Sequence, residues 1–235
     1  MIVLKQTLTA VFVFCSIAVS AQNLKELSPV RFGKNYNEQD ANAFDAVKKD
    51  YEENGKNWTG EDWQNAEEKG FSETFSSDYW DVIGDACSWY CGGTTEFVAA
   101  SSFLPAQGNN SYTGNHVDDL NTKTVWAEGV PGYGIGEWIQ IRVPEARITT
   151  IIIVNGYVKS QKAWENNSRV KQLKLYLDDK PYAILNLKDC RSEQYFELDE
   201  PFRGMLKFEI VDVYKGKLYD DTVISEIFYD GIDVH

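Results

Sequence analysis

The feature that most constrains the fold is a series of short apolar segments, each separated from the next by turn-forming residues. Arg147–Asn155 contains an uninterrupted run of three isoleucines and a valine, which predicts a strand buried on both faces. Val170–Leu177 alternates apolar and polar residues, as a strand with one buried face does. Similar segments are Thr94–Phe103, Ile139–Val143, which Pro144 should end, Tyr182–Leu187, Gln194–Leu198, Met205–Val213 and Val223–Tyr229. Many short strands joined by turns predict a mainly β protein, an antiparallel β-sandwich of the jelly-roll type.

A short helical region precedes these strands. Asp40–Glu53 carries apolar residues at helical spacing, and Gly55 should stop the helix. Thr59, followed three residues later by Asp62, has the spacing that caps a second, shorter helix. Six aromatic residues of this region could pin it onto the β domain, although for most of them simple packing is the preferred interpretation: Trp58, Trp63, Phe71, Phe75, Tyr79 and Trp80.

The first residues have the pattern of a secretory signal peptide. Lys5 supplies charge, Ala10–Val19 is apolar, and small residues precede Gln22. The apolar run is too short for a membrane anchor. Lipid attachment at Cys15 is a weaker alternative, because bulky Phe14 stands where a small residue is expected. We therefore predict a secreted or periplasmic protein with three parts: residues 1–21 as the signal peptide, 22–86 as a partly helical appendage and 87–235 as the β domain.

The chain is strongly acidic. Its 36 acidic residues outnumber 23 basic ones, for a net charge of -13. Nucleic-acid binding is disfavoured because it requires a basic surface, and so is electrostatic binding to anionic lipid. No later segment is apolar enough for membrane insertion. Neutral ligands or cations fit this charge better.

The cysteines suggest one disulfide. Cys87 and Cys91 could close a small loop in an oxidising compartment, which would leave Cys190 over. A zinc site is the competing interpretation, but the only histidines are His116 and His235, and no second ligand pair is visible.

One turn-rich segment, Val117–Trp138, concentrates acids, amides, hydroxyls and glycines between two apolar regions. Asp119, Asn121 and Thr124 have a spacing that gathers oxygen ligands on one loop, as a hard cation such as Ca²⁺ requires. The alternative is that these residues form turns in which the side chains bond their own backbone. The glycines of the following GYGIG give it β-turn character; it lacks the residues of a phosphate-binding loop.

Several segments occur in a characteristic order: ASSFL, DDLNTKTVWAEGVPGYGIGEWIQI, IIIVNGYVKSQKAW, NNSRVKQLKLYL, ILNLKD and YDDTVISEIFYDG. Together they resemble the galactose-binding-like jelly roll in its discoidin, or coagulation-factor type-C, branch. Within that branch the chain is similar to the glycan-binding, translocation-type domain attached to bacterial NAD glycohydrolase toxins, from about Cys87 to His235. The resemblance implies a structural cation, usually calcium, held by Asp119, Asn121 and Thr124, with Glu226 joining them from the last strand.

The resemblance also implies a ligand site on loops at one end of the sandwich. Aromatic rings there would stack on a sugar, and polar groups would bond its hydroxyls. Alternatively, Trp126 could be a core residue and Arg169 could be a salt-bridge partner, without contact to a ligand. Trp164, in a polar loop, is the better candidate for exposure. The candidates are Trp126, Glu128, Tyr133, Tyr157, Lys159, Trp164, Asn167 and Arg169.

We expect no enzymatic activity. In the toxins NAD cleavage belongs to a separate catalytic domain, for which we expect no room after His235. A hydrolase elbow motif is missing, and nothing places Cys190 beside His116, although paired carboxylates leave a cryptic hydrolase open. The prediction is a secreted bacterial module that binds a glycan or glycoconjugate. The alternative is an adhesion or translocation adaptor, with a possible protein partner on residues 22–86.

Overall fold

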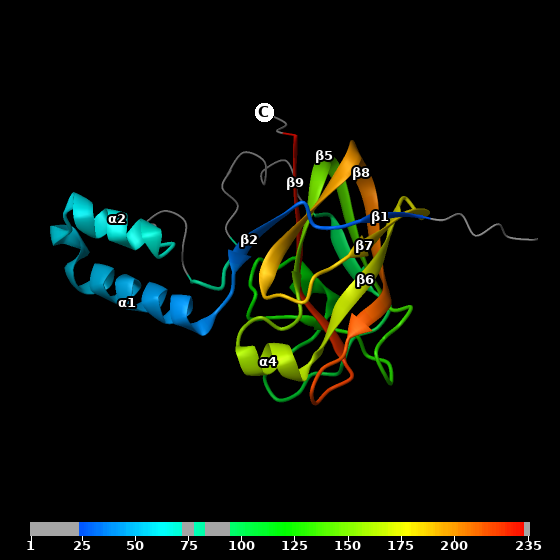
Figure 1. Ribbon diagram of the computed structural model, residues 1–235, viewed down its shortest axis with the longest axis horizontal. Coiled ribbons are helices and arrows are strands. Elements are labelled where there is room, and N and C mark those ends of the chain that lie inside the picture. The colour runs from blue at the N-terminus through cyan, green and yellow to red at the C-terminus, as the bar shows by residue number, and fades with distance from the viewer. Residues whose placement is uncertain (1–23, 72–77, 83–94, 233–235) are drawn as a thin grey trace, which may run out of the picture.

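The computed structural model describes residues 24–71, 78–82 and 95–232. Within these ranges the chain is mainly β, with a short helical region near its start (Figure 1). The strands are β1 (Lys25–Leu27), β2 (Arg31–Asn35), β3 (Phe97–Ala100), β4 (Trp126–Ala127), β5 (Trp138–Asn155), β6 (Ser168–Leu177), β7 (Lys180–Asn186), β8 (Ser192–Tyr214) and β9 (Thr222–Ile232). The helices are α1 (Glu38–Asn54), α2 (Gly60–Glu68) and α4 (Gln161–Asn166), with 3-10 turns η1 (Gly55–Asn57) and η2 (Gly114–Val117).

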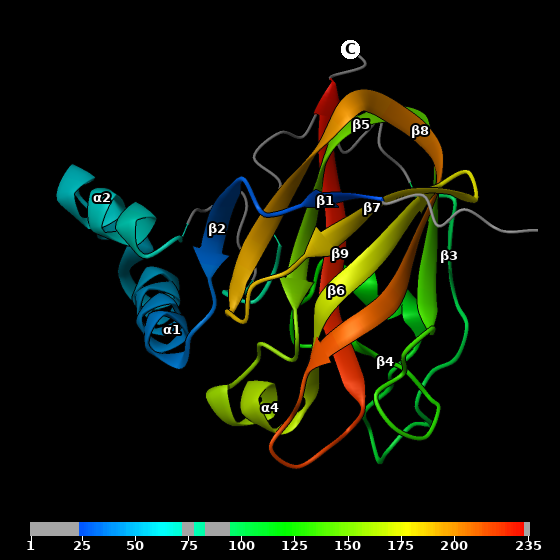
Figure 2. The ribbon, with the colours of Figure 1, turned by 45° about the vertical axis from the view of Figure 1, so that its right-hand side comes forward.

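Two long strands, β5 and β8, pass from one layer of the sandwich to the other (Figure 2). The first half of β5, Trp138–Val143, pairs with the second half of β8, residues 204–209. The second half of β5, residues 150–154, pairs with the first half of β8, residues 193–197. The first pairing extends through β6 and β7 to β1 and, on the other side, to β3. The second extends to β2 and, through β9, to β4. The predicted antiparallel sandwich is therefore confirmed, although β1–β7 and β6–β9 are parallel pairs.

The sequence pattern divided each long strand in two. Pro144 should have ended a strand, yet β5 continues through it, and the pairing register shifts between Val143 and Ile148. Proline lacks the N–H that a ladder needs, so it marks the bend instead of the end. In β8 the bend falls at Gly204, whose φ of 133° is open to glycine alone.

The main hydrophobic core lies between the two layers. Ile139 and Ile141 of β5 meet Phe208 of β8 there, together with Leu173 of β6 and Ile227 of β9. All five side chains are fully or almost fully buried. Because side chains alternate along a strand, Ile152 and Val154 of β5 and Phe228 of β9 point to the outer face of their layer.

The N-terminal region covers that outer face. Ile152, Val154 and Phe228 pack there against a second cluster that includes Tyr36 and Phe44. The isoleucine–valine run is buried on both faces, as predicted. Of the aromatic residues expected to pin this region, Phe71, Tyr79 and Trp80 lie in the cluster and Trp58 and Trp63 pack against it, whereas Phe75 lies outside the described residues.

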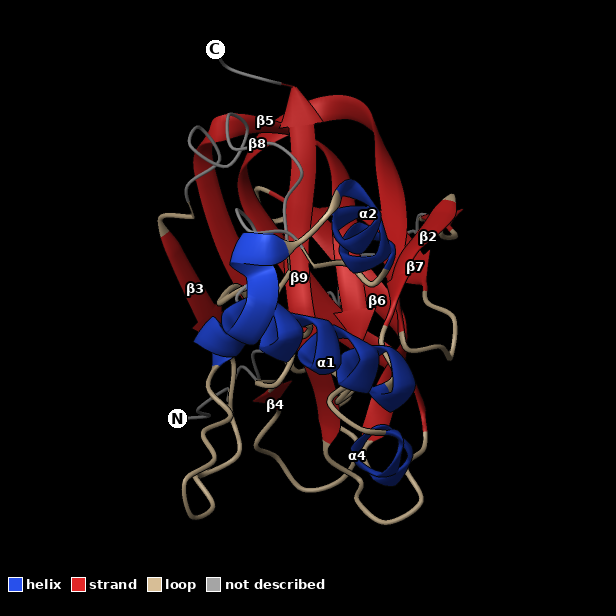
Figure 3. Ribbon diagram, turned by 90° about the vertical axis from the view of Figure 1, so that its left-hand side faces the viewer, coloured by secondary structure: helices blue, strands red, loops and turns tan. Residues whose placement is uncertain are grey.

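Both predicted helices form, and their caps explain where they begin. The Asn37 side chain accepts from the Asp40 amide at the start of α1, and Thr59 and Asp62 form a reciprocal capping box at the start of α2. Figure 3 shows the helix pair in front of the β9 side of the sandwich. Strands β1 and β2 also precede residue 87, and both join the sandwich sheets.

None of the described helices combines the length and the apolar character that crossing a bilayer requires.

Candidate ligand pocket and cation loop

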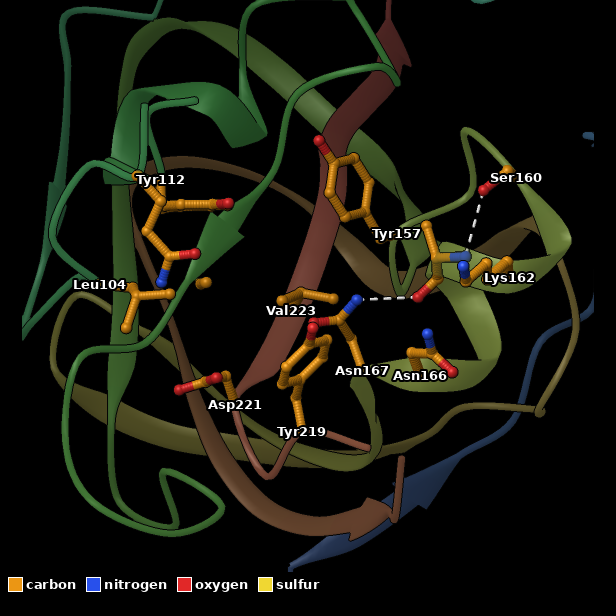
Figure 4. A pocket seen from close by; sticks show the side chains of 13 residues that line it. Leu104, Tyr112, Tyr157, Ser160, Lys162, Asn166, Asn167, Tyr219, Asp221 and Val223 are labelled. Carbon is orange, nitrogen blue, oxygen red and sulfur yellow. Dashed lines mark hydrogen bonds between the residues drawn. The ribbon is translucent and has the colours of Figure 1, made fainter. Parts of the chain in front are cut away.

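A pocket opens at the end of the sandwich where β5 ends and β9 begins (Figure 4). Its cavity volume is about 310 Å³, at the lower end of the range for small-molecule sites. Segments far apart in sequence form its wall: residues 104–112, residues 157–167, which follow β5 and include α4, and residues 219–223. The apolar side chains in its lining are Leu104, Ala127, Ala163 and Val223.

Three tyrosines surround this cavity. Tyr157 is almost buried and packs with Val125, Ala127 and Val223, so its ring is held rigidly. Tyr112 is half-buried, and burial raises the pKa of its hydroxyl. Tyr219 is 48% exposed and stands at the mouth. Figure 4 shows the rings arranged around the pocket space. Tyrosines combine an apolar ring with a polar tip, which suits a ligand that has both kinds of surface.

The short helix α4 supplies a polar wall. Its N-cap, Ser160, accepts a hydrogen bond from the Ala163 amide at 3.1 Å, and Asn167 Nδ2 donates to the Ala163 carbonyl at 2.8 Å. These contacts fix the helix at both ends. Across the described parts of the chain, the side chains of Gln107, Lys162 and Asn166 form no hydrogen bond or ion pair. Their polar groups can therefore bond a ligand without breaking existing contacts.

Tyr157 and Asn167 are the two sequence-predicted ligand residues that line this pocket. Lys159 touches it indirectly, since its Nζ lies 2.6 Å from the Tyr157 hydroxyl. Tyr133 lies elsewhere: its carbonyl accepts from the Thr222 hydroxyl, and Lys215 lies 4.9 Å from its ring centroid.

Trp126 and Glu128 belong to the interior instead. Trp126 is fully buried in the main core, and its indole N–H donates to the Ser102 carbonyl at 2.9 Å. Glu128 is fully buried and accepts from the Val130 and Thr222 amides. The prediction that these two side chains contact a ligand is therefore wrong, because both are enclosed and already bonded. Burial also raises the pKa of Glu128.

Trp164 and Arg169 form a structural pair that does not line the pocket. The Arg169 guanidinium lies 4.4 Å from the Trp164 ring centroid and forms a bidentate ion pair with Asp189, at 2.8 and 3.0 Å. Trp164 packs against the second hydrophobic cluster. A Cβ atom at Gly156, whose φ is 78°, would lie within 3 Å of both side chains. The expected exposure of Trp164 is corrected accordingly, and the salt-bridge alternative for Arg169 is confirmed.

The remaining pocket residues were not singled out from the sequence. Tyr112, Tyr219 and Asp221 lie in irregular segments without periodicity. Only the composition of LYDDT could have indicated them. This segment places an aromatic residue and two acids in a turn directly before a buried strand, and binding side chains often lie on such loops because the strand holds the backbone in place.

The predicted cation loop brings together oxygen atoms from two distant segments. Glu226 of β9 is fully buried, and its Oε1 accepts from the Asn121 amide at 2.8 Å. Thr124 Oγ1 lies 2.8 Å from an Asp119 carboxylate oxygen and 2.8 Å from the Asn121 carbonyl. Leu120 has a φ of 58°, a strained conformation for a residue with a side chain. All four predicted ligand residues therefore meet.

The Asn121 side chain differs from its predicted role. Its Oδ1 accepts from the Lys123 amide at 3.0 Å, so it bonds the loop's own backbone. Asp119 likewise accepts from the Asn121 amide and contacts His116. The turn-forming alternative thus holds for the Asn121 side chain, and its backbone carbonyl is the oxygen that faces Thr124.

Three observations bear on whether a cation fits this loop. Glu226 Oε2 is buried and has no hydrogen-bond partner among the described residues. Burial and the neighbouring Asp119 raise the pKa of Glu226 well above its ordinary value. Side-chain carboxylates alone do not complete a metal site, since within the described ranges no three His, Cys, Asp or Glu side chains form a metal-binding group. A calcium ion would therefore draw on Asp119, Glu226, the Thr124 hydroxyl and backbone carbonyls, and its charge would satisfy the orphaned oxygen.

A segment of the N-terminal region closes over the same loop. The Thr122 amide and hydroxyl both donate to the Trp80 carbonyl, at 3.0 and 2.7 Å, and the Val82 amide donates to the Leu120 carbonyl. The loop is thus held between β9 and residues 78–82.

The predicted disulfide between Cys87 and Cys91 lies outside the described residues, as does the predicted signal peptide. Cys190 is a free cysteine.

The fold and the end-loop pocket define a binding module of the galactose-binding-like class. The family model of the NAD glycohydrolase translocation F5/8 type C domain matches residues 89–230, more than half of the chain. The chain belongs to this family, as its motifs predicted. No curated protein matches it.

Solved structures from Clostridium perfringens are distant neighbours. A CBM32 module of CpGH89, in complex with GalNAc-β-1,3-galactose, has 15% identity and a TM-score of 0.45, over 57% of this chain and 93% of that one. The family 32 CBM of NanJ, in complex with galactose, has 15% identity and a TM-score of 0.44, over 57% and 91%. The CBM32-1 and CBM32-2 domains of ZmpB have 9% identity and a TM-score of 0.47, over 59% of this chain; the match spans 34% of that structure. Similarity at this level carries no information about the ligand of this chain.

Proposed function

We propose that this protein is a secreted, non-catalytic carbohydrate-binding module of bacterial type that recognises a surface glycan. The pocket between β5, α4 and β9 is the ligand site. The observation that carries the proposal is the tyrosine-lined cavity, whose wall includes the amide groups of Gln107 and Asn166, which have no hydrogen-bond partner among the described residues. Family membership supports a binding role over a catalytic one.

The chemistry of the pocket suits a sugar. A sugar ring has an apolar face that packs on tyrosine and a rim of hydroxyls that requires donors and acceptors. Tyr157 and Tyr219 supply ring surface, and Asn166 and Asn167 supply amide groups. Helix α4 is fixed at both ends by its own hydrogen bonds, so little ordering cost opposes binding.

We also propose that Ca²⁺ binds the loop of residues 118–124. The buried, unpartnered oxygen of Glu226 beside Asp119 supports this, since a cation would compensate both acids. When bound, the ion would supply positive charge and fix the loop. The pocket residues would make all the contacts to the sugar.

A broad glycan array with the purified protein, in calcium and in chelator, tests the proposed function. A small set of related glycans should bind, and free sugar should compete. Tyr219→Ala should weaken binding about tenfold, since one aromatic contact contributes on the order of 1 kcal/mol. Leu218→Ala is the matched control, because Leu218 is its exposed neighbour and does not line the pocket. A blank array in both conditions would overturn the proposal and favour a protein-binding adaptor.

A further inference from the structure

One carboxylate in the pocket, that of Asp221, has no ion-pair partner among the described residues. Asp221 lines the cavity directly before β9, and its backbone is fixed because its carbonyl accepts from the Ser168 amide at 3.0 Å. The next residue, Thr222, is fully buried and bonded to Glu128 and Tyr133. Within the described part of the chain the Asp221 carboxylate forms no ion pair, and its hydrogen bond is with its own backbone amide. It is therefore a rigidly placed acceptor that faces the ligand space.

The surroundings of Asp221 favour a positive charge. Partial burial raises the pKa of Asp221, and the neighbouring acid Asp220 raises it further. Tyr112 and Tyr219 are the other titratable groups near it in the pocket. Lys162, the one basic residue of the lining, lies on the opposite side of the cavity (Figure 4). A ligand group with a full positive charge would best compensate this carboxylate.

We propose that the ligand of the pocket is an amino sugar, a hydroxylated ring with a free primary ammonium that pairs with Asp221. This inference rests on the proposed carbohydrate-binding function. The tyrosines would hold the ring, and the amides of α4 would bond its hydroxyls. An ammonium adds the attraction of opposite charges to its hydrogen bond with the carboxylate, so it is preferred over a neutral hydroxyl or acetamide at the same position.

Calorimetric titration of the full chain distinguishes these ligands. Glucosamine, glucose and N-acetylglucosamine, and the corresponding galactose series, would be titrated at about pH 6.5, where an amine of ordinary pKa is protonated. One amino sugar should bind about tenfold more tightly than its neutral and acetylated counterparts. Asp221→Asn should abolish that difference and leave weak binding of the neutral sugar. Asp220→Asn is the matched control: it removes the adjacent exposed acid and should keep the preference.

Each other outcome has a defined meaning. If a neutral or acetylated sugar binds as tightly as the amino sugar, the inference fails while the carbohydrate-binding function stands. If no sugar binds in either series or on the array, the proposed function itself fails. If tetramethylammonium competes as well as the amino sugar, the pocket recognises a cation alone and the sugar part is overturned. Unchanged melting temperatures of both variants would show that these differences do not arise from unfolding.

Discussion

Two acids at the start of β9, five positions apart, occupy opposite environments. Asp221 lines an open pocket, and among the described residues its carboxylate bonds only its own backbone amide and forms no ion pair. Glu226 is fully buried and bonds the Asn121 amide, and its other carboxylate oxygen has no hydrogen-bond partner in the part of the chain that the structure describes. A ligand can reach and leave Asp221 without disturbing the fold. A cation at Glu226 would be enclosed by the loop and by residues 78–82, so its binding would be coupled to stability.

The largest expected effect is at the enclosed site. Calcium at a hundred times its Kd should stabilise the protein by about 2.7 kcal/mol and raise the Tm by roughly 5–10 °C. Glu226→Gln should remove this shift, because the amide cannot supply the anionic oxygen. Differential scanning fluorimetry with calcium and with chelator measures both. Asp230→Asn, on the exposed end of the same strand, is the control and should retain the shift. A calcium-independent Tm in the unmodified chain would contradict the cation proposal.

A second variant separates packing from binding beside the pocket. Trp164→Ala should lower the free energy of unfolding by about 1–3 kcal/mol, since Trp164 packs on the second cluster and on Arg169. Sugar affinity should change less than twofold, because Trp164 does not line the cavity. Urea unfolding and calorimetric titration give the two quantities. Lys162→Ala, on the same helix, should weaken sugar binding and leave the free energy of unfolding unchanged. A large loss of affinity in Trp164→Ala at unchanged stability would return Trp164 to the ligand site.

The smallest effect is a pH dependence at the open site. Because the pKa of Asp221 is raised, affinity for an amino sugar should fall on acidification at a higher pH than for an ordinary aspartate. The stability contribution of Asp221 has the opposite sign: it is present below the unfolded pKa and is lost as the pH rises through the folded pKa. Titrations across this range measure affinity, and melting curves measure stability. The sugar affinity of Asp221→Asn should not fall on acidification in this way. If it does, the pH dependence of the affinity belongs to another group.

Periodic segments carried most of the fold information in the sequence. The β-sandwich, the doubly buried run around Ile152 and both capped helices follow from patterns that local sterics and burial impose. The long strands β5 and β8 could not be predicted as continuous. Pro144 and Gly204 end strands in most settings, and they bend these because pairing on both sides holds the backbone.

The pocket was less predictable than the cation loop. Asp119, Asn121 and Thr124 are close in sequence, so their proximity follows from spacing, and the resemblance supplied Glu226. The pocket side chains come from segments far apart in the sequence, several of them irregular, that only the tertiary fold brings together. Trp126 and Trp164 attracted attention as large aromatics, but large aromatic rings also pack best in interiors, and both pack there.

The covering of the outer β face by the N-terminal region sets a practical limit on the β domain alone. A protein truncated to residues 87–235 would lose β1 and β2 and would uncover Ile152, Val154 and Phe228 as an apolar patch beside an unpaired strand edge. Such surfaces promote self-association. Glycan binding measured on that fragment would thus be confounded by aggregation, whereas a protein that starts ahead of β1 keeps the surface closed.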